Sequence, residues 1–282
     1  MRKTAVYLLL IVLLFFCVIP FYLMLINMTR TNDEINRGIS LLPGTALINN
    51  FQNLVLGRKD NVSGLRWGAL NIGRGFINSL LVAASATILS AYFSALTAYG
   101  FAVYRFYGKK ILFGVILTVI MIPNTVSLIG IYKLITGLGM QDTYWPLILP
   151  AIASPFSVYF LRQYIISVMP YPLIEAARID GAGELKIFHQ IMLPLLVPGI
   201  ATVSIFFFLA SWNSYLLPLT VLNSQELYTL PLLIQQLNTT TFNRDLGTLY
   251  AGVAVSVIPI IIAFVFLSRY IIQGLAEGSI KE

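Results

Sequence analysis

The sequence predicts an all-α polytopic membrane protein with six transmembrane helices. Of its 282 residues, 58% are hydrophobic and only 10% are charged, and the mean hydropathy is +0.84. Soluble domains carry about 25% charged residues, so this composition excludes an ordinary soluble fold. Apolar runs also recur along the chain, and each approaches the roughly 20 helical residues that a bilayer core requires.

The first apolar run predicts a retained transmembrane helix. Arg2 and Lys3 precede an uncharged segment, residues 4–29, which contains Pro20 as an expected kink. A secretory signal has a hydrophobic core of about 7 to 15 residues and a small-residue cleavage site. This run is longer and lacks such a site. We therefore expect residues 1–29 to form the first transmembrane helix, with a cytoplasmic N-terminus.

A polar segment, residues 30–74, follows and predicts an extracytoplasmic loop. Its charges are mixed, and it is rich in Asn and Gly. One short amphipathic helix is expected around Asn50 to Leu56. Residue types alone assign no function to this loop.

Five further apolar runs complete the predicted set of six spans. Several contain proline, which a transmembrane helix tolerates where neighbouring helices satisfy the freed carbonyls. The runs are Phe76–Tyr104, Ile111–Tyr132, Tyr144–Leu161, Leu195–Leu222 and Leu246–Leu267.

A polar stretch, residues 170–194, interrupts the apolar pattern between the fourth and fifth spans. A short helix is expected from Leu173 to Asp180, ended by Gly181. Gly181 is also expected to cap a second helix that has Glu184 at its third position. Apolar residues recur at helical spacing on this second helix, namely Leu185, Phe188, Ile191 and Met192.

The first of these two helices has a distinctive surface. Ala176 and Ala177 leave the backbone bare, and the charged residues Glu175 and Arg178 flank them. A small-sided helix with charged neighbours suits insertion into a groove on a soluble partner. The alternative is an ordinary amphipathic loop that lies on the lipid headgroups.

The distribution of basic residues predicts the orientation. Short loops on the cytoplasmic side of a membrane carry an excess of Lys and Arg. A cytoplasmic N-terminus places Arg105, Lys109, Lys110, Arg162 and Arg269 inside, close to the ends of spans. The same orientation places residues 170–194 inside, where an ATPase can reach them.

The residues that catalysis, ion coupling or nucleic-acid binding would need are missing from the pattern. The six predicted spans contain no Asp, Glu, Lys, Arg or His, which ion-coupled carriers normally hold at depth. No phosphate-binding G-x-x-x-x-G-K-[ST] motif occurs, so if ATP drives the process, another chain binds ATP with Mg²⁺ and hydrolyses it. The single histidine, His189, has no nearby metal or nucleophile partner. We expect no enzyme activity, no metal and no cofactor in this chain, and the scattered basic residues predict no nucleic-acid partner despite the net charge of +7.

The polar stretch carries a motif of fixed spacing. Glu-Ala-Ala is followed after three residues by Gly, after nine more by Ile, and after one more by Leu-Pro; the matching residues are Glu175, Ala176, Ala177, Gly181, Ile191, Leu193 and Pro194. This pattern resembles the EAA loop of the membrane subunits of binding-protein-dependent ABC importers. The form EAARIDGA is similar to the carbohydrate-uptake branch, and within it to the maltose-type second permease.

The resemblance extends over about residues 75–282. Ile122-Pro123-Asn124, Tyr144-Trp145 and Leu161-Arg162-Gln163 occur in the order seen in sugar permeases of this type. Trp212-Asn213 followed by Leu217-Pro218-Leu219 resembles the signature of the fifth helix. The resemblance implies a type I ABC importer transmembrane domain at 75–269 and a cytoplasmic C-terminal tail at 270–282.

The resemblance also implies the partners and the coupling residues. It implies a heterodimer with a sister permease, a homodimeric cytoplasmic ATPase, and an extracytoplasmic protein that delivers a sugar, in the cytoplasmic membrane of a bacterium or archaeon. The ATPase-coupling residues would be Glu175, Ala176, Ala177, Arg178, Asp180 and Gly181. The tail residues Gly278 and Lys281 would contact the ATPase, and Tyr228 to Arg244 would approach the binding protein or simply be solvated.

The substrate path is less defined by the sequence. Trp212, Asn213 and Asn124 are of the types that stack on or hydrogen-bond a pyranose, although in helices such residues more often serve packing. Two other functions remain open at this point. One is a self-sufficient carrier or channel, and the other is the same architecture with a non-sugar cargo.

Overall fold

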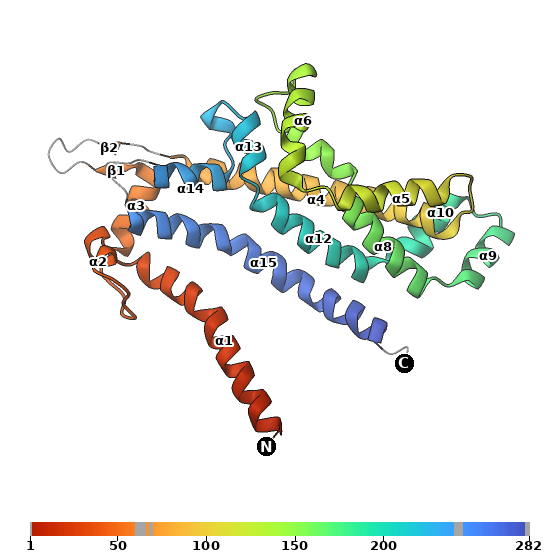
Figure 1. Ribbon diagram of the computed structural model, residues 1–282, viewed down its shortest axis with the longest axis horizontal. Helices are drawn as coiled ribbons and strands as arrows, with labels where there is room; N and C mark the ends of the chain where they lie inside the picture. The colour runs from red at the N-terminus through yellow and green to blue at the C-terminus, as the bar shows by residue number, and fades with distance from the viewer. Residues whose placement is uncertain (1, 60–65, 68–69, 240–244, 280–282) are drawn as a thin grey trace. The chain divides into compact units, whose positions relative to one another are not determined.

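The computed structural model describes residues 2–59, 66–67, 70–239 and 245–279, and these are almost entirely helical (Figure 1). The exception is one antiparallel pair of two-residue strands, β1 (Arg58–Lys59) and β2 (Arg66–Trp67). The chain divides into two compact units. One comprises Met1–Ile77 and Tyr228–Pro259, and the other comprises Asn78–Leu227 and Ile260–Glu282.

The first unit contains the N-terminal helix and the predicted polar loop, residues 30–74, which forms short helices. Its helices are α1 (Arg2–Asn27), α2 (Asn32–Asn36), α3 (Leu47–Leu56), α14 (Leu230–Thr239) and the start of α15 (Leu246–Ser279). The expectation of a single short helix in this loop was incomplete, because α2 is also present and α3 begins at Leu47. A capping box at Thr31 starts α2: the Thr31 hydroxyl accepts from the Glu34 backbone N–H, and the Glu34 carboxylate accepts from the Thr31 N–H.

Asn50 fixes the loop of the first unit to the chain around it. Its side-chain amide donates to the carbonyl oxygens of Met28 (2.8 Å) and Arg30 (2.9 Å), and Asn50 itself is buried. Gly247 lies so close to Asn50 and Arg30 that an added Cβ would overlap them. A glycine at this position therefore permits the start of α15 to approach the loop.

The second unit holds the remaining helices. In chain order these are most of α4 (Ile72–Val103), α5 (Lys109–Ile120), α6 (Asn124–Gly137), α7 (Trp145–Ile148), the 3₁₀ helix η1 (Leu149–Ile152), α8 (Pro155–Val168), α9 (Tyr171–Ile179), α10 (Glu184–Ile187), the π-helix η2 (Phe188–Met192), α11 (Leu193–Leu195), α12 (Val197–Trp212), α13 (Leu216–Val221) and the 3₁₀ helix η3 (Gln225–Leu227). The predicted polar stretch corresponds to α9 through α11.

Three of the six predicted spans are continuous helices of sufficient length and apolarity. They are Val6–Asn27, Ile72–Val103 and Leu246–Ser268. A fourth candidate is a pair, Glu184–Leu195 with Val197–Trp212, that is bent by 77°. The predicted third run is divided between α5 and α6 just before Asn124, and the predicted fourth is divided between η1 and α8. Pro123 and Pro155 stand at these breaks, because proline lacks a backbone N–H and disfavours helix in the residue before it.

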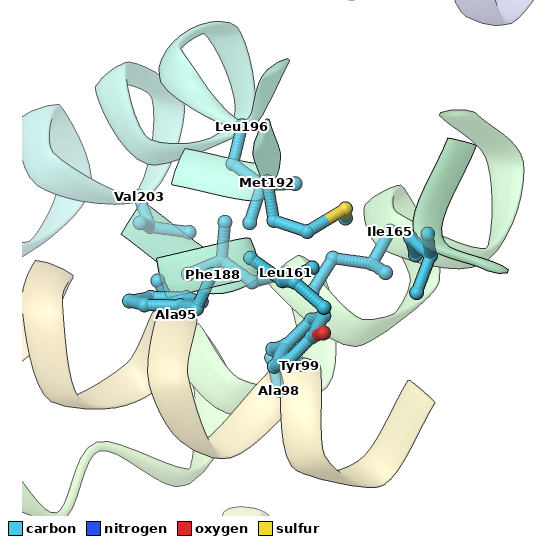
Figure 2. Packing of buried hydrophobic residues seen from close by; sticks show 11 residues of the cluster. Ala95, Ala98, Tyr99, Leu161, Ile165, Phe188, Met192, Leu196 and Val203 are labelled. Carbon is cyan, nitrogen blue, oxygen red and sulfur yellow. The ribbon is translucent and has the colours of Figure 1, made fainter. Parts of the chain in front are cut away.

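The core of the second unit lies where α4 and α8 meet the polar stretch. Figure 2 shows Phe188 and Met192 of η2 converging with Tyr99 of α4 and Leu161 of α8. The rings of Tyr99 and Phe188 lie 5.5 Å apart. Small residues on α4 permit this close packing; the fully buried set includes Ala95 and Ala98. The polar stretch is thus anchored by apolar side chains on one face.

Candidate functional site

Helix α9 ends in a Schellman motif, which places Gly181 just after the helix. The Ala182 N–H donates to the Ala177 carbonyl (2.9 Å), and the Gly181 N–H donates to the Arg178 carbonyl (3.0 Å). Gly181 has a φ of +77°, which favours a residue without a Cβ. The sequence correctly placed a glycine stop here, although the helix begins at Tyr171 and ends at Ile179 instead of spanning Leu173 to Asp180.

The prediction that Gly181 caps the second helix was wrong. Gly183 occupies the N-cap position of α10, and Glu184 is the first helical residue instead of the third. The physical reason is backbone conformation. An N-cap residue has extended φ and ψ, which Gly183 has at −68° and 152°, whereas Gly181 is left-handed.

The two faces of α9 differ in burial. Ile174 is buried against the core, and Ala177 packs against it partly buried. Glu175, Ala176 and Asp180 are exposed, and we call these three residues the acidic surface of α9. Within the described part of the chain, neither carboxylate makes a hydrogen bond or an ion pair. The acidic surface is therefore available to a basic partner.

Arg178 belongs to a different arrangement. Its Nε donates to Glu184 Oε1 at 2.8 Å, across the glycine joint. Glu184 Oε2 accepts hydrogen bonds from the Tyr104 hydroxyl and from the Tyr99 hydroxyl (3.3 Å). Tyr99 lies near the end of α4, and Tyr104 is the first residue after this helix. We call Tyr99, Tyr104, Arg178 and Glu184 the Glu184 network. The hydrogen bond to Glu184 raises the pKa of Arg178, so this guanidinium stays charged.

Sequence reasoning grouped Arg178 with the coupling residues and did not include the other members of the Glu184 network. The available signal was an acid that follows an arginine by six residues across a glycine joint. The two tyrosines are 80 and 85 residues away from Glu184, so only the fold reveals them.

The π-helix η2 carries the sole histidine. His189 is exposed; its Nδ1 lies 2.7 Å from the Leu185 carbonyl oxygen, and its Nε2 lies 3.1 Å from the Tyr92 hydroxyl. A carbonyl oxygen only accepts, so Nδ1 carries a proton. Phe188 and Met192 are buried as their spacing predicts, whereas Leu185 is 66% exposed and lies outside the buried cluster.

The three predicted substrate-path residues lie in different environments. Trp212 is 1% exposed and stacks on Phe208 at 5.8 Å between ring centroids, which favours the packing alternative. Asn213 follows α12, and its side-chain amide donates to the Leu209 carbonyl at 2.8 Å. Asn124 begins α6, and its side chain lies outside the described residues.

The remaining predictions concern the tail and metals. The backbone of Gly278 belongs to α15, while Lys281 lies outside the described residues. Tyr228 to Arg244 includes α14, and its last part, 240–244, is likewise not described. Among the residues that the structure covers, no group of three or more His, Cys, Asp or Glu side chains is placed to hold a metal ion.

A second carboxylate joins two connections elsewhere in the same unit. Asp142, between α6 and α7, accepts from the backbone N–H groups of Asn223 (2.9 Å) and Ser224 (2.8 Å) and from the Ser224 hydroxyl. These hydrogen bonds, led by the one from the Ser224 hydroxyl, hold the pKa of the Asp142 carboxyl below its usual value. Asp142 also has a positive φ of 55°, which is uncommon outside glycine.

Comparison with known proteins places this geometry in a family. Residues 90–277 match the family described as binding-protein-dependent transport system inner membrane component. The arabinooligosaccharides transport system permease protein of Halalkalibacterium halodurans is 36% identical over 95% of this chain and 92% of its own. The sn-glycerol-3-phosphate transport system permease protein of Brucella abortus is 31% identical over 92% of this chain and 90% of its own.

The fold has a counterpart among solved structures. A chain of a bacterial ABC transporter involved in the import of the acidic polysaccharide alginate superposes with a TM-score of 0.79, at 18% identity and 96% coverage of both chains. At this identity the likeness concerns the fold. Together with the family match over residues 90–277, it means that the chain belongs to the inner membrane components of binding-protein-dependent transport systems.

Proposed function

We propose that this chain is a membrane-spanning permease subunit of an ATP-driven sugar importer, and that α9 couples it to the ATPase. Six membrane crossings would form half of the translocation path, and a sister permease would supply the other half. The ATP and Mg²⁺ would be bound by a pair of cytoplasmic ATPase subunits. The family supports this assignment, since its members are transport components and not enzymes.

The main support for a coupling role of α9 is its acidic surface. Glu175 and Asp180 are exposed, and Ala176 between them presents only a methyl group. Exposed carboxylates next to a bare helix surface fit a groove with basic residues on an ATPase. Arg178 would contribute indirectly, because its guanidinium pairs with Glu184 of the same chain.

The proposed orientation places both termini in the cytoplasm. Arg105 lies in the loop after α4, and Arg162 lies within α8. Basic residues are in excess on the cytoplasmic side of membrane proteins, so this orientation would place both residues on that side. In this orientation the C-terminal residues Gly278 and Lys281 would approach the ATPase. The segment Tyr228 to Arg244 would face outward, toward a sugar-binding protein.

The proposed cargo is an oligosaccharide. The relative from Halalkalibacterium halodurans is named for arabinooligosaccharides, and its coverage of this chain is nearly complete. The relative from Brucella abortus is named for sn-glycerol-3-phosphate, which keeps a non-sugar cargo as the second candidate. A binding assay on the cognate binding protein distinguishes the two.

The test is uptake of labelled sugar into proteoliposomes that hold the complete complex and its binding protein. We expect uptake to require ATP, and Glu175→Lys to abolish it while the chain still inserts into the membrane. The control is Asp33→Lys, which makes the same charge change on the exposed start of α2, in the proposed outer loop.

Two results would contradict the proposal. Uptake down a gradient by this chain alone, without ATPase, would identify a self-sufficient carrier. Normal ATP-driven uptake by the Glu175→Lys variant would show that the acidic surface of α9 does not couple the two proteins.

A further inference from the structure

We infer that Glu184 is a positioning residue that makes α9, α10 and the end of α4 move as one body. This inference rests on the proposed coupling role of α9 and adds a route by which its displacement reaches a membrane-spanning helix. The juxtaposition that carries it is the Glu184 network, in which one carboxylate joins three helices.

The connection between α9 and α10 is rich in glycine and can therefore bend. Residues 180–183 connect the two helices, and two of these four are glycines, Gly181 and Gly183. Glycine permits more backbone conformations than any other residue, so a helix pushed on one side of such a joint can turn without moving the other. A coupling helix attached only through this link would lose part of its displacement.

The Arg178–Glu184 pair crosses the joint. Arg178 is in the last turn of α9, and Glu184 is the first residue of α10. The two side chains are 40% and 43% exposed, and a surface ion pair of this kind contributes little to stability. Its effect is instead geometric. With Arg178 Nε and Glu184 Oε1 2.8 Å apart, the pair holds the end of α9 close to the start of α10.

The second oxygen of Glu184 extends the connection to α4. Oε2 accepts from the hydroxyls of Tyr104 and Tyr99, and the Arg178 guanidinium also lies over the Tyr104 ring, 5.9 Å from its centroid. Tyr99 is 2% exposed and contacts Phe188 beneath the network. The carboxylate is therefore held from both sides: by the cation of α9, and by the phenols of Tyr99 in α4 and of Tyr104 directly after it.

The test measures sugar uptake and ATP hydrolysis together in the assembled transporter in proteoliposomes. For Glu184→Gln and Tyr104→Phe we expect uptake per ATP hydrolysed to fall on the order of tenfold, since a hydrogen bond to a charged group is of that magnitude, while hydrolysis continues. The double variant should be no worse than the stronger single variant, because both remove the same connection. Tyr92→Phe is the matched control. It removes a hydroxyl from the same helix, one that contacts His189 and not Glu184, and should keep the wild-type ratio.

The outcomes separate this inference from the proposed function. If the wild type imports with ATP and both network variants keep its ratio, the inference is wrong while the proposed function stands. A parallel fall of uptake and hydrolysis, or loss of the assembled complex, would assign Glu184 a merely structural role and also overturn it. If wild-type uptake needs no ATP, the proposed function itself fails.

Discussion

Glu184 and Asp142 each use one carboxylate to join distant parts of the second unit, but with different partners. Glu184 accepts from three side chains, those of Arg178, Tyr104 and Tyr99. Asp142 accepts from two backbone N–H groups and one hydroxyl, all in Asn223 and Ser224. The first connection depends on which residues are present, whereas the second depends mainly on the path of the backbone.

This difference predicts different sensitivity to substitution. Every contact of the Glu184 network can be removed by changing one side chain on a neighbouring helix. Most contacts of Asp142 survive any substitution at Asn223 or Ser224 except proline, because the backbone N–H remains. The Asp142 connection is instead vulnerable at Asp142 itself, whose positive φ restricts the residues that fit there.

The largest effect is expected from removing the apolar support beneath the Glu184 network. Phe188 is fully buried, and a buried Phe replaced by Ala costs about 3–5 kcal/mol. Phe188→Ala should therefore lower the melting temperature of the detergent-solubilised protein clearly. Leu185→Ala, one turn earlier and 66% exposed, is the control and should change it little. Equal effects of the two variants would mean that η2 does not pack as described.

An intermediate effect is expected at the glycine joint. Gly181→Ala places a Cβ on a residue with φ of +77°, which costs about 1–2 kcal/mol in a left-handed conformation. Exchange of the backbone amide hydrogens at positions 181 and 182, which close the Schellman motif, should then be faster than in the wild type.

Gly183→Ala is the matched control for the joint. Gly183 has an ordinary φ of −68°, and an added Cβ meets nothing within 4 Å at either glycine. Any difference between the two variants thus reports backbone conformation alone. Equally fast exchange in both would contradict the left-handed assignment at Gly181.

The Asp142 connection should respond to pH. Because the folded carboxyl has a lowered pKa, its contribution to stability is present above the ordinary carboxyl range and is lost as the pH falls through the lowered value. Asp142→Asn tolerates the positive φ and keeps one acceptor but cannot ionise. The wild type should melt higher than this variant near neutral pH, and the difference should shrink as the pH falls below the ordinary carboxyl range. A difference independent of pH would show that the charge of Asp142 is irrelevant.

The smallest effect is expected at Ser224. Ser224→Ala removes one hydroxyl donor and leaves both backbone N–H groups on Asp142. Its melting temperature should lie close to that of the wild type and above that of Asp142→Asn. A larger loss for Ser224→Ala than for Asp142→Asn would reverse the comparison, since one hydroxyl donor would then contribute more to stability than the charge of the Asp142 carboxylate.

Local chemistry determined which features could be predicted from the sequence. Gly181 as a helix stop and the burial of Phe188 and Met192 follow from residue type and spacing, and the structure confirms them. The family followed from the EAA motif together with the shorter motifs that match over about residues 75–282. The capping role of Gly183 could not be separated from that of Gly181, since both are glycines within reach of the same helix start.

Long-range features could not be predicted. Nothing near Glu184 in the sequence points to Tyr99 or Tyr104, and nothing near Asp142 points to Ser224. The continuous runs at 111–132 and 144–161 looked like single helices because hydropathy ignores the backbone N–H that proline lacks. Trp212 also illustrates this limit, since an indole that could stack on a sugar is stacked on Phe208 instead.

The π-helix η2 gives a structural meaning to the residue count in the EAA motif. A π turn closes on the fifth residue following, so η2 accommodates one residue more than an α turn would. Ile191 lies inside this wider turn, and Phe188 and Met192 on either side of it both reach the buried cluster. Inserting or deleting one residue after Gly181 would rotate the Phe188 and Met192 side chains by roughly 100° about the helix axis. They would then no longer pack in the buried cluster. The number of residues in this segment therefore matters for the position of the loop as much as the residue types do.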